Sequence, residues 1–324
     1  MKNIILTIGA AVSIFCLVSC TQKTHEDAEV GPYTVSVIDK NIYHIQDYNS
    51  EFPAGEMFNE EGKIVHFNNC SDMYLIVGKK KALLIDLSNN IRWADNAVES
   101  LRQLVAERTE GKELTITFTH NHGDHIGMLH AYTDDPEVKF ALPETDFIRL
   151  IDRFPAEQCS FVNDGHIFDL GGISVETIEV PGHTDGSVIF SIKGKDIFFT
   201  GDAIGSGHGV WIFNEPSYRN YAAAVKNLIE WIENPANSID PTKLRIYGGH
   251  YWQKDWLPEL DGAEMGMSYL LDMNKLIEEI ATGTASTEPS NLGRPDLDTY
   301  FRHGSAIVVW NAEQAAQYAG SGCF

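Results

Sequence analysis

The stretch that decides the fold reads Thr119-His120-Asn121-His122-Gly123-Asp124-His125. It follows the apolar and β-branched run 114–118, which predicts a strand. Because side chains alternate along an extended loop, His120 and His122 can face one point while Asp124 and His125 face a second point nearby. Folding alone does not call for such a group of imidazoles and a carboxylate, so a surface cluster without metal is the weaker interpretation. The loop therefore predicts ligands for two cations.

Strands and helices on both sides of this loop are predicted from hydrophobic periodicity and turn residues. The first half has strands at 33–38, 42–46, 73–77, 82–86 and 114–118, with a helix at 91–106. The second half has strands at 173–180, 187–192, 196–200 and 244–247, with a helix at 218–232. A helix at 258–281, a loop at 282–298 and a strand at 305–310 follow. Two β-then-α halves predict an α/β fold.

Four more motifs flank the histidine-rich loop in a fixed order. They are Leu84-Ile85-Asp86, Pro181-Gly182-His183-Thr184, Thr200-Gly201-Asp202 and Gly248-Gly249-His250. Together with the HxHxDH loop they resemble the metallo-β-lactamase superfamily, over a stretch from about Met73 to His250. The resemblance implies a four-layer αβ/βα sandwich with the metals at one edge, between the two sheets.

The resemblance also assigns the ligands residue by residue. His120, His122 and His183 resemble the ligands of a first metal, and Asp124, His125 and His250 those of a second metal. Asp202 resembles the carboxylate that bridges both. Asp86 is similar to the acid behind the loop, which would orient a ligand imidazole. This mixture of imidazole and carboxylate suits two zinc ions, although iron or manganese would also accept it.

Such a centre predicts a metal-dependent hydrolase of a small-molecule carbonyl compound: an ester, a lactone or a thioester. Two cations about 3.5 to 4 Å apart share a hydroxide that attacks the carbonyl carbon. Asp124 would then pass a proton to the leaving group. Candidate substrate contacts are His208, Trp211, Tyr218 and Tyr221, with Phe213 beside them. The resemblance to lactonases of the superfamily implies that Tyr218 or Tyr221 would stabilise the oxyanion. For each of these residues, loop or core packing is the favoured interpretation over a specific role.

Four alternatives stay open at this point. A β-lactamase is disfavoured because such enzymes generally carry cysteine or serine where Asp202 stands. Glyoxalase II enzymes keep the aspartate, but their basic C-terminal region has no counterpart after His250. A persulfide dioxygenase, which shares most ligand positions, would use one iron. A non-catalytic metal-binding lipoprotein would not need the complete ligand set.

The N-terminus resembles a bacterial lipoprotein signal. One lysine and an apolar run precede Leu17-Val18-Ser19-Cys20, so residues 1–19 are the predicted signal peptide and Cys20 the predicted lipidation site. Residues 20–32 are the predicted tether, and residues 33–324 the predicted domain. No later stretch is apolar enough to span a bilayer. We therefore expect an exported protein, held at the cell envelope on the periplasmic or outer-membrane side by its lipid alone.

The composition excludes one class of partner and leaves two questions open. Asp and Glu number 46 against 24 Lys and Arg, for a formal net charge of −22, so a nucleic acid would be repelled. Outside the predicted signal and lipidation site, Cys70, Cys159 and Cys323 show no CxxC spacing. A disulfide framework is not indicated, although one pair could form. The oligomeric state is not predicted.

Overall fold

The computed structural model describes residues 26–48, 55–58, 64–67, 70–251, 253, 264–290 and 292–321. The predicted signal peptide and Cys20 lie outside these residues. The predicted tether, 20–32, is wrong at its end, because β1 (Ala28–Val30) pairs antiparallel with β2 (Tyr33–Asp39). The sheet thus begins before the predicted domain boundary. Among the described residues, no helix is long and apolar enough to cross a membrane.

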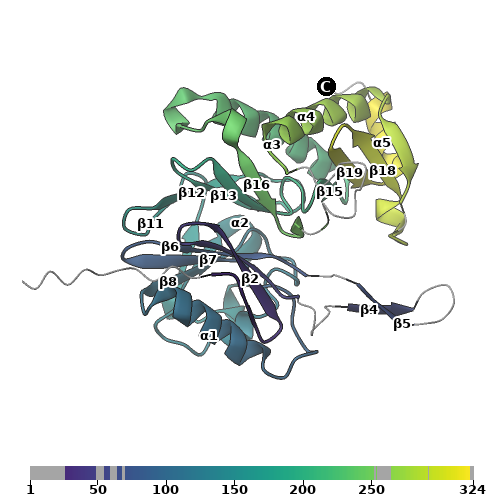
Figure 1. Ribbon diagram of the computed structural model, residues 1–324. Coiled ribbons are helices and arrows are strands. Elements are labelled where there is room, and N and C mark those ends of the chain that lie inside the picture. Colours follow the sequence, from purple (N-terminus) through teal and green to yellow (C-terminus); the bar gives the residue numbers. More distant parts are fainter. Residues whose placement is uncertain are drawn as a thin grey trace, which may run out of the picture.

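The first sheet has eight strands in the order β1-β2-β3-β6-β7-β8-β9-β10. Besides β1 and β2 they are β3 (Ile42–Gln46), β6 (Met73–Val77), β7 (Lys81–Ile85), β8 (Glu113–Thr117), β9 (Lys139–Pro143) and β10 (Cys159–Val162). The strands from β7 to β10 run parallel, and the others antiparallel. A hairpin of β4 (Gly55–Phe58) and β5 (Ile64–Phe67) projects away from this sheet (Figure 1).

The second sheet lies against the first and has the order β11-β12-β13-β14-β16. Its strands are β11 (Ile167–Asp169), β12 (Ser174–Glu179), β13 (Val188–Ile192), β14 (Ile197–Gly201) and β16 (Arg245–Gly248). Helix α1 (Ala97–Thr109) covers the outer face of the first sheet. Helices α3 (Glu215–Glu233) and α4 (Met267–Thr282) lie over the second (Figure 1). The order of layers is therefore helix, sheet, sheet, helix.

Alternation along the central strands explains the layers. In β7, Ala82 and Leu84 join the buried cluster under α1, whereas Leu83 and Ile85 join the cluster between the sheets. In β14, Phe199 faces the first sheet and Phe198 packs with α3 and α4. A strand buried on both faces needs apolar residues at every position, which is why these strands read as continuous hydrophobic runs.

The C-terminal part forms a third sheet, with the order β15-β19-β18-β17. Its strands are β15 (Gly209–Trp211), β17 (Ser286–Pro289), β18 (Thr299–His303) and β19 (Ala306–Trp310), and helix α5 (Ala312–Gly320) follows. The strand predicted at 305–310 is present as β19. The loop predicted at 282–298 is wrong in part, because β17 pairs with β18. Being an exposed edge strand, β17 tolerates Pro289 and carries no apolar alternation.

Helix starts differ from their predicted positions for local reasons. Helix α3 begins at Glu215 instead of residue 218, because Asn214 caps it by accepting a hydrogen bond from the Ser217 N–H at 2.9 Å. Helix α1 begins at Ala97 rather than residue 91. Helix α4 was expected from residue 258, but it begins at Met267 after Met265 has paired with Ile246 beside β16. Residues 258–263 lie outside the described part.

Candidate metal centre

Five strand ends converge on one edge of the sandwich. Asp86 follows β7, and the loop 119–125 follows the neighbouring parallel strand β8. From the second sheet, His183 follows β12, Asp202 follows β14, and His250 follows β16. Strands β14 and β16 are parallel, and β12 runs in their direction because β13 is antiparallel to both of its neighbours. Strands that point the same way end at the same edge, so their loops meet there.

The first-metal residues lie together. Ligand atoms of His120, His122 and His183 are all within 4.8 Å of one another. His183 Nε2 lies 2.9 Å from His122 Nδ1. His120 is fully buried, and its Nδ1 lies 3.0 Å from the Thr119 hydroxyl, which leaves Nε2 for a metal. Three imidazoles around one point make a typical zinc-binding set.

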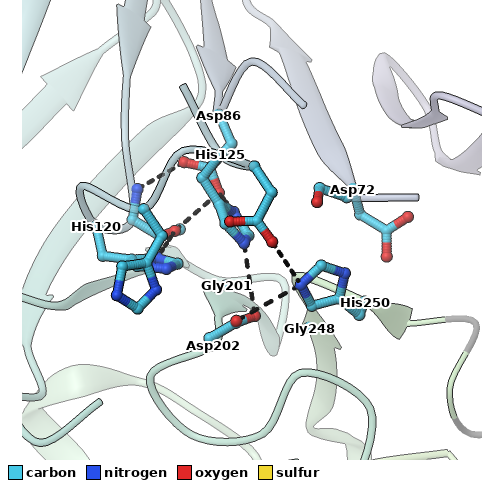
Figure 2. A network of polar contacts seen from close by, with 12 residues as sticks. Asp72, Asp86, His120, His125, Gly201, Asp202, Gly248 and His250 are labelled. Atoms are coloured by element: carbon cyan, nitrogen blue, oxygen red, sulfur yellow. Dashed lines mark hydrogen bonds and ion pairs between the residues drawn. The ribbon is translucent and has the colours of Figure 1, made fainter. Parts of the chain in front are cut away.

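The second-metal residues form an adjoining group. Ligand atoms of Asp124, His125 and His250 are also within 4.8 Å of one another. His250 Nε2 lies 3.4 Å from Asp124 Oδ2. Asp202 stands between the two groups: its carboxylate oxygens lie 3.7 Å from His125 Nε2 and 3.6 Å from the Nε2 atoms of His183 and His250 (Figure 2). It has the position that a bridging carboxylate requires.

Asp86 supports the loop from behind. One of its oxygens lies 2.9 Å from His125 Nδ1 and accepts a hydrogen bond from the Thr119 hydroxyl at 2.8 Å, while the other accepts from the Thr119 N–H at 2.7 Å (Figure 2). Its backbone φ of 65° turns the chain sharply at the end of β7, in a conformation that aspartate adopts more readily than most residues. The structure places Asp86 where it orients the His125 imidazole.

The polar atoms of the centre fit cations. His120 Nε2, His125 Nε2 and Asp202 Oδ1 are buried without a hydrogen-bond partner among the described residues. His183 and His250 use Nδ1 on the carbonyl oxygens of Trp211 and Cys70, at 3.0 and 2.7 Å, and aim Nε2 into the centre. Buried polar groups are normally paired, so a metal ion would satisfy these unpaired atoms, which converge on one region.

Electrostatics favour metal binding over protonation at the first position. Burial lowers the pKa of His183 to about 4, and it also lowers the pKa of His120 and His122. These imidazoles stay neutral at neutral pH, as metal ligation requires. Burial opposes the charge on His125 as well, but the Asp202 and Asp86 carboxylates raise its pKa to about 10. A cation beside Asp202 would replace that proton.

The structure corrects the tyrosine predictions. Tyr218 and Tyr221 lie on α3, and both are fully buried in the core, so neither hydroxyl is presented to a substrate. The Tyr218 hydroxyl donates to the Ile277 carbonyl at 2.8 Å, and its ring stacks on Trp310 at 4.6 Å between centroids. The Tyr221 hydroxyl donates to the Ile204 carbonyl at 2.8 Å. Both side chains therefore have structural roles.

The other substrate-contact predictions have mixed outcomes. His208 is fully buried, with Nδ1 3.1 Å from the Ser305 carbonyl and its ring edge-on to Tyr269, so a substrate contact there is wrong. Trp211 acts on the centre through its backbone carbonyl, which holds His183. Phe213 is the aromatic residue beside the ligands, with its ring centroid 5.9 Å from that of His122 and 5.5 Å from that of His183.

Asp146 and Arg294 are among the residues near the centre that the sequence analysis did not name. Asp146, in the short helix α2 (Glu144–Phe147), is buried and contacts the loops of both His122 and His183. Arg294 lies over the Phe213 ring, with its guanidinium carbon 5.4 Å from the centroid. Neither belongs to a motif, so only the tertiary structure brings them to the site.

Comparison with known proteins agrees with this geometry. A family model described as the Metallo-beta-lactamase superfamily matches residues 71–236. An atrochrysone carboxyl ACP thioesterase of Claviceps purpurea is 26% identical over 181 residues, which is 56% of this chain and 50% of the relative. A hydroxyacylglutathione hydrolase of Prochlorococcus marinus is 29% identical over 204 residues, 60% of this chain and 72% of the relative.

A third relative and two solved structures extend the comparison. A probable polyketide biosynthesis zinc-dependent hydrolase of Bacillus velezensis is 26% identical over 174 residues, 53% of this chain and 68% of the relative. The chain spans about half the length of the thioesterase relative. The DIM-1 metallo-beta-lactamase aligns with TM-score 0.52 and 17% identity, over 78% of this chain and 99% of that structure. A metallo-beta-lactamase from Pontibacter korlensis aligns with TM-score 0.51 and 18% identity, over 76% and 99%. These likenesses confirm the predicted four-layer fold.

Proposed function

We propose that this chain, which belongs to the metallo-β-lactamase superfamily, binds two zinc ions and hydrolyses an ester, lactone or thioester of a small molecule with an apolar acyl part. The observation that carries the proposal is the arrangement of Asp202. Its carboxylate lies 3.6 to 3.7 Å from imidazole nitrogens of both ligand groups. A single carboxylate placed in this way serves two cations rather than one.

Three relatives support the choice of bond. One is named a thioesterase, one a hydroxyacylglutathione hydrolase and one a zinc-dependent hydrolase. Hydrolysis of a carboxylic ester or thioester would need the same attack on a carbonyl carbon. Asp202 also argues against a β-lactamase, because β-lactamases of the superfamily generally carry a cysteine or a serine at this position.

The side chains divide the work of the reaction. When bound, the zinc ions would supply Lewis acidity and a water whose pKa falls towards about 7. His120, His122 and His183 would hold the first position, and Asp124, His125 and His250 the second. Asp86 keeps His125 turned with Nε2 inward. The Asp124 side chain, 40% exposed, is the most accessible acid of the centre, so its free oxygen can carry a proton to the leaving oxygen or sulfur.

Phe213 supports the choice of substrate. Its ring is partly buried and lies edge-on to His122, so it offers an apolar wall beside the first position. An acyl chain would gain burial against that wall. The formal net charge of −22 disfavours a polyanionic substrate such as an oligonucleotide. A neutral or weakly anionic carbonyl compound fits both features.

The test combines metal analysis with a matched substrate panel. Purified full-length protein should contain two zinc ions, and kcat/KM should be highest for an ester, lactone or thioester with an apolar acyl part. Phe213→Ala should lower kcat/KM more for a hexanoyl than for an acetyl ester, whereas an exposed Phe161→Ala control should change neither. A tenfold preference for β-lactams or phosphodiesters, about 1.4 kcal/mol in the transition state, would overturn the proposal. So would a single iron with oxygen uptake on a persulfide.

A further inference from the structure

Outside the metal ligands and Asp86, two buried carboxylates join loops that the sequence keeps far apart. Asp146 has 6% of its surface exposed, and Asp72 has none. Neither offers an atom to the ligand groups, and neither is needed to transfer a proton. Burying a charged group is costly unless its oxygens are well paired, so the partners of these carboxylates indicate their role.

Both carboxylate oxygens of Asp146 accept hydrogen bonds from the loops of the first metal position. Oδ2 accepts hydrogen bonds from the Asn121 N–H at 3.0 Å and from the Thr184 hydroxyl at 2.8 Å. Oδ1 accepts from the Gly186 N–H at 2.8 Å. Asn121 stands between His120 and His122, and Thr184 directly follows His183. One carboxylate therefore ties together the two loops that supply all three imidazoles.

The contact between Asp146 and the residue at position 186 requires a glycine there. A Cβ atom built on Gly186 would lie 2.5 Å from the Asp146 backbone nitrogen and 2.7 Å from Asp146 Oδ1. Real side chains do not approach so closely, so any other residue at position 186 would push the carboxylate away. The Asn121 side chain donates a further hydrogen bond to the Asp146 carbonyl at 3.0 Å. Asn121 thus contacts both the side chain and the backbone of Asp146 in α2.

Asp72 makes the corresponding connection at the second metal position. Its Oδ2 accepts a hydrogen bond from the Tyr251 N–H at 2.5 Å, and its own N–H donates to the Gly249 carbonyl at 2.7 Å. These two hydrogen bonds fix the residues on either side of His250, Gly249 and Tyr251. Two residues earlier, the Cys70 carbonyl accepts from His250 Nδ1 at 2.7 Å, and Figure 2 shows Asp72 beside the His250 segment.

Asp72 is itself held in place. Its Oδ1 lies 2.9 Å from His44 Nε2, and it accepts a hydrogen bond from Gln46 Nε2 at 3.2 Å. The His44 ring stacks on Tyr74, whose hydroxyl donates to the Gly248 carbonyl at 2.6 Å. Thus β3 and β6 of the first sheet hold the end of β16 in the second, across the sandwich.

The geometry points to Asp146 and Asp72 as positioning residues, each of which fixes the ligand loops of one metal position: Asp146 the first, Asp72 the second. The inference rests on the two-metal site of the proposed function. Its consequence is selectivity, because the two carboxylates share no hydrogen-bond partner within the described part of the chain. Loss of one should loosen one position and largely spare the other, through misplaced imidazoles rather than lost ligands.

The test measures metal binding without any substrate. Full-length protein is stripped of metal, then titrated with Zn²⁺ against a chromophoric chelator and with Co²⁺ followed by absorption. His122→Ala and His250→Ala, which each remove one ligand, provide reference spectra for protein with an impaired first or second position. Asp185→Asn is the charge-matched control, since Asp185 is exposed and adjoins Thr184.

We expect Asp146→Asn to weaken binding at the first position by at least tenfold, to change the second by less than threefold, and to give a Co²⁺ spectrum like that of His122→Ala. Asp72→Asn should show the reverse pattern and match His250→Ala, while Asp185→Asn matches wild type. If Asp146→Asn does not fold, Thr184→Val removes one of the same hydrogen bonds from the other side. Thr184→Ser, which keeps the hydroxyl, should restore binding.

Two kinds of result overturn the inference. In the first, wild type binds two ions and both variants keep wild-type affinities at both positions. In the second, each variant weakens both positions alike in step with a fall in the melting temperature, which would indicate a merely structural role. A wild-type protein that binds only one ion would instead refute the two-metal proposal from which the inference starts.

Discussion

At the scale of single residues, the centre depends on how each side chain uses its two ends. His183 and His250 anchor Nδ1 on backbone carbonyls and leave Nε2 free, and His125 does the same through Asp86. This arrangement selects one tautomer and one ring orientation before any metal arrives. Asp202 has no such anchor for Oδ1, which is buried and unpaired among the described residues. A cation shared by the two ligand groups would account for this buried oxygen.

Asp202→Ala should therefore lower the zinc content and reduce kcat/KM by more than about 100-fold, the upper end of what loss of an outer supporting residue costs. The domain should stay folded, since the polar contacts of the Asp202 side chain among the described residues are to other ligands of the centre rather than to the core. Metal analysis and circular dichroism check both points. His208→Ala is the contrast: it should keep both ions but lower the melting temperature, because His208 is buried against Ser305. A fully active Asp202→Ala enzyme would contradict the bridging role.

Asp47 predicts a pH dependence of stability. Burial raises the pKa of its carboxyl to about 7, while hydrogen bonds from Asn89 oppose this rise. Between the ordinary value of 3.8 and about 7, the folded state then holds a proton that the unfolded chain has lost. The free energy of unfolding should therefore fall as pH rises through this window, by on the order of 1 kcal/mol per pH unit.

Asp47→Asn should remove this slope, because an amide keeps an acceptor for the Asn89 N–H and does not titrate. Urea denaturation of metal-free wild type and Asp47→Asn between pH 5 and pH 7 measures the difference. The free energy of unfolding of the variant, relative to that of the wild type, should increase steadily as pH rises. Parallel profiles for the two proteins would show that Asp47 titrates at its ordinary pKa.

At the scale of elements, helix α3 shows how one helix can carry aromatic residues for packing alone. Its buried residues include Tyr218, Tyr221, Val225 and Leu228, all on the face that meets α4 and the second sheet. The aromatic wall of the metal centre comes from just after the short strand β15, which is held by parallel pairing with β19. Phe213 and β19, which holds β15 in place, are thus far apart in the sequence.

Tyr218→Phe should therefore leave kcat within about twofold of wild type and lower the free energy of unfolding by about 1 kcal/mol, the usual net value of one hydrogen bond. The lost bond is the one to the Ile277 carbonyl, while stacking on Trp310 remains. Thermal unfolding and steady-state kinetics measure the two effects. A 100-fold drop in kcat with unchanged stability would return Tyr218 to the list of catalytic groups.

At the scale of the whole molecule, charge and location act together. The formal net charge of −22 belongs to a chain whose first residues resemble a lipoprotein signal. We propose that residues 1–19 are removed and that Cys20 carries the lipid. An acidic domain attached in this way would stay in solution above an anionic membrane surface, with only its anchor inserted.

Cys20→Ala should release the protein from the membrane, because the predicted lipid attachment atom is the sulfur of this residue. Detergent phase partitioning of the protein expressed in a bacterium that processes lipoproteins measures the change. Wild type should enter the detergent phase, and the variant the aqueous phase. Cys159→Ala serves as the control, since Cys159 lies in the folded domain with a free thiol. Wild type found wholly in the aqueous phase would refute the anchor.

Local patterns in the sequence predicted an α/β fold, the central strands and the histidine-rich loop. The resemblance carried by the order of the motifs implied the four-layer arrangement and the full ligand set, which the structure brings together at one edge. These features are visible because each depends on local pattern. Alternating or continuous apolar runs mark strands whatever they pack against, and ligands that follow strand ends keep their motif spacing. Helix α3 was also placed closely, and its Asn214 cap is a sequence signal that would have placed its start.

Only the tertiary structure decided which polar and aromatic side chains face the centre. A buried tyrosine on an amphipathic helix has the same sequence pattern whether it contacts a core or a substrate. Only the contacts in the folded protein show that Tyr218 packs in the core while Phe213 lies beside the ligands. Asp146 and Asp72 likewise resemble ordinary turn or strand-end acids until folding buries them between distant loops. The third sheet remained hidden for the same reason: β17 is exposed and unpatterned, and its partner β18 alone makes it a strand.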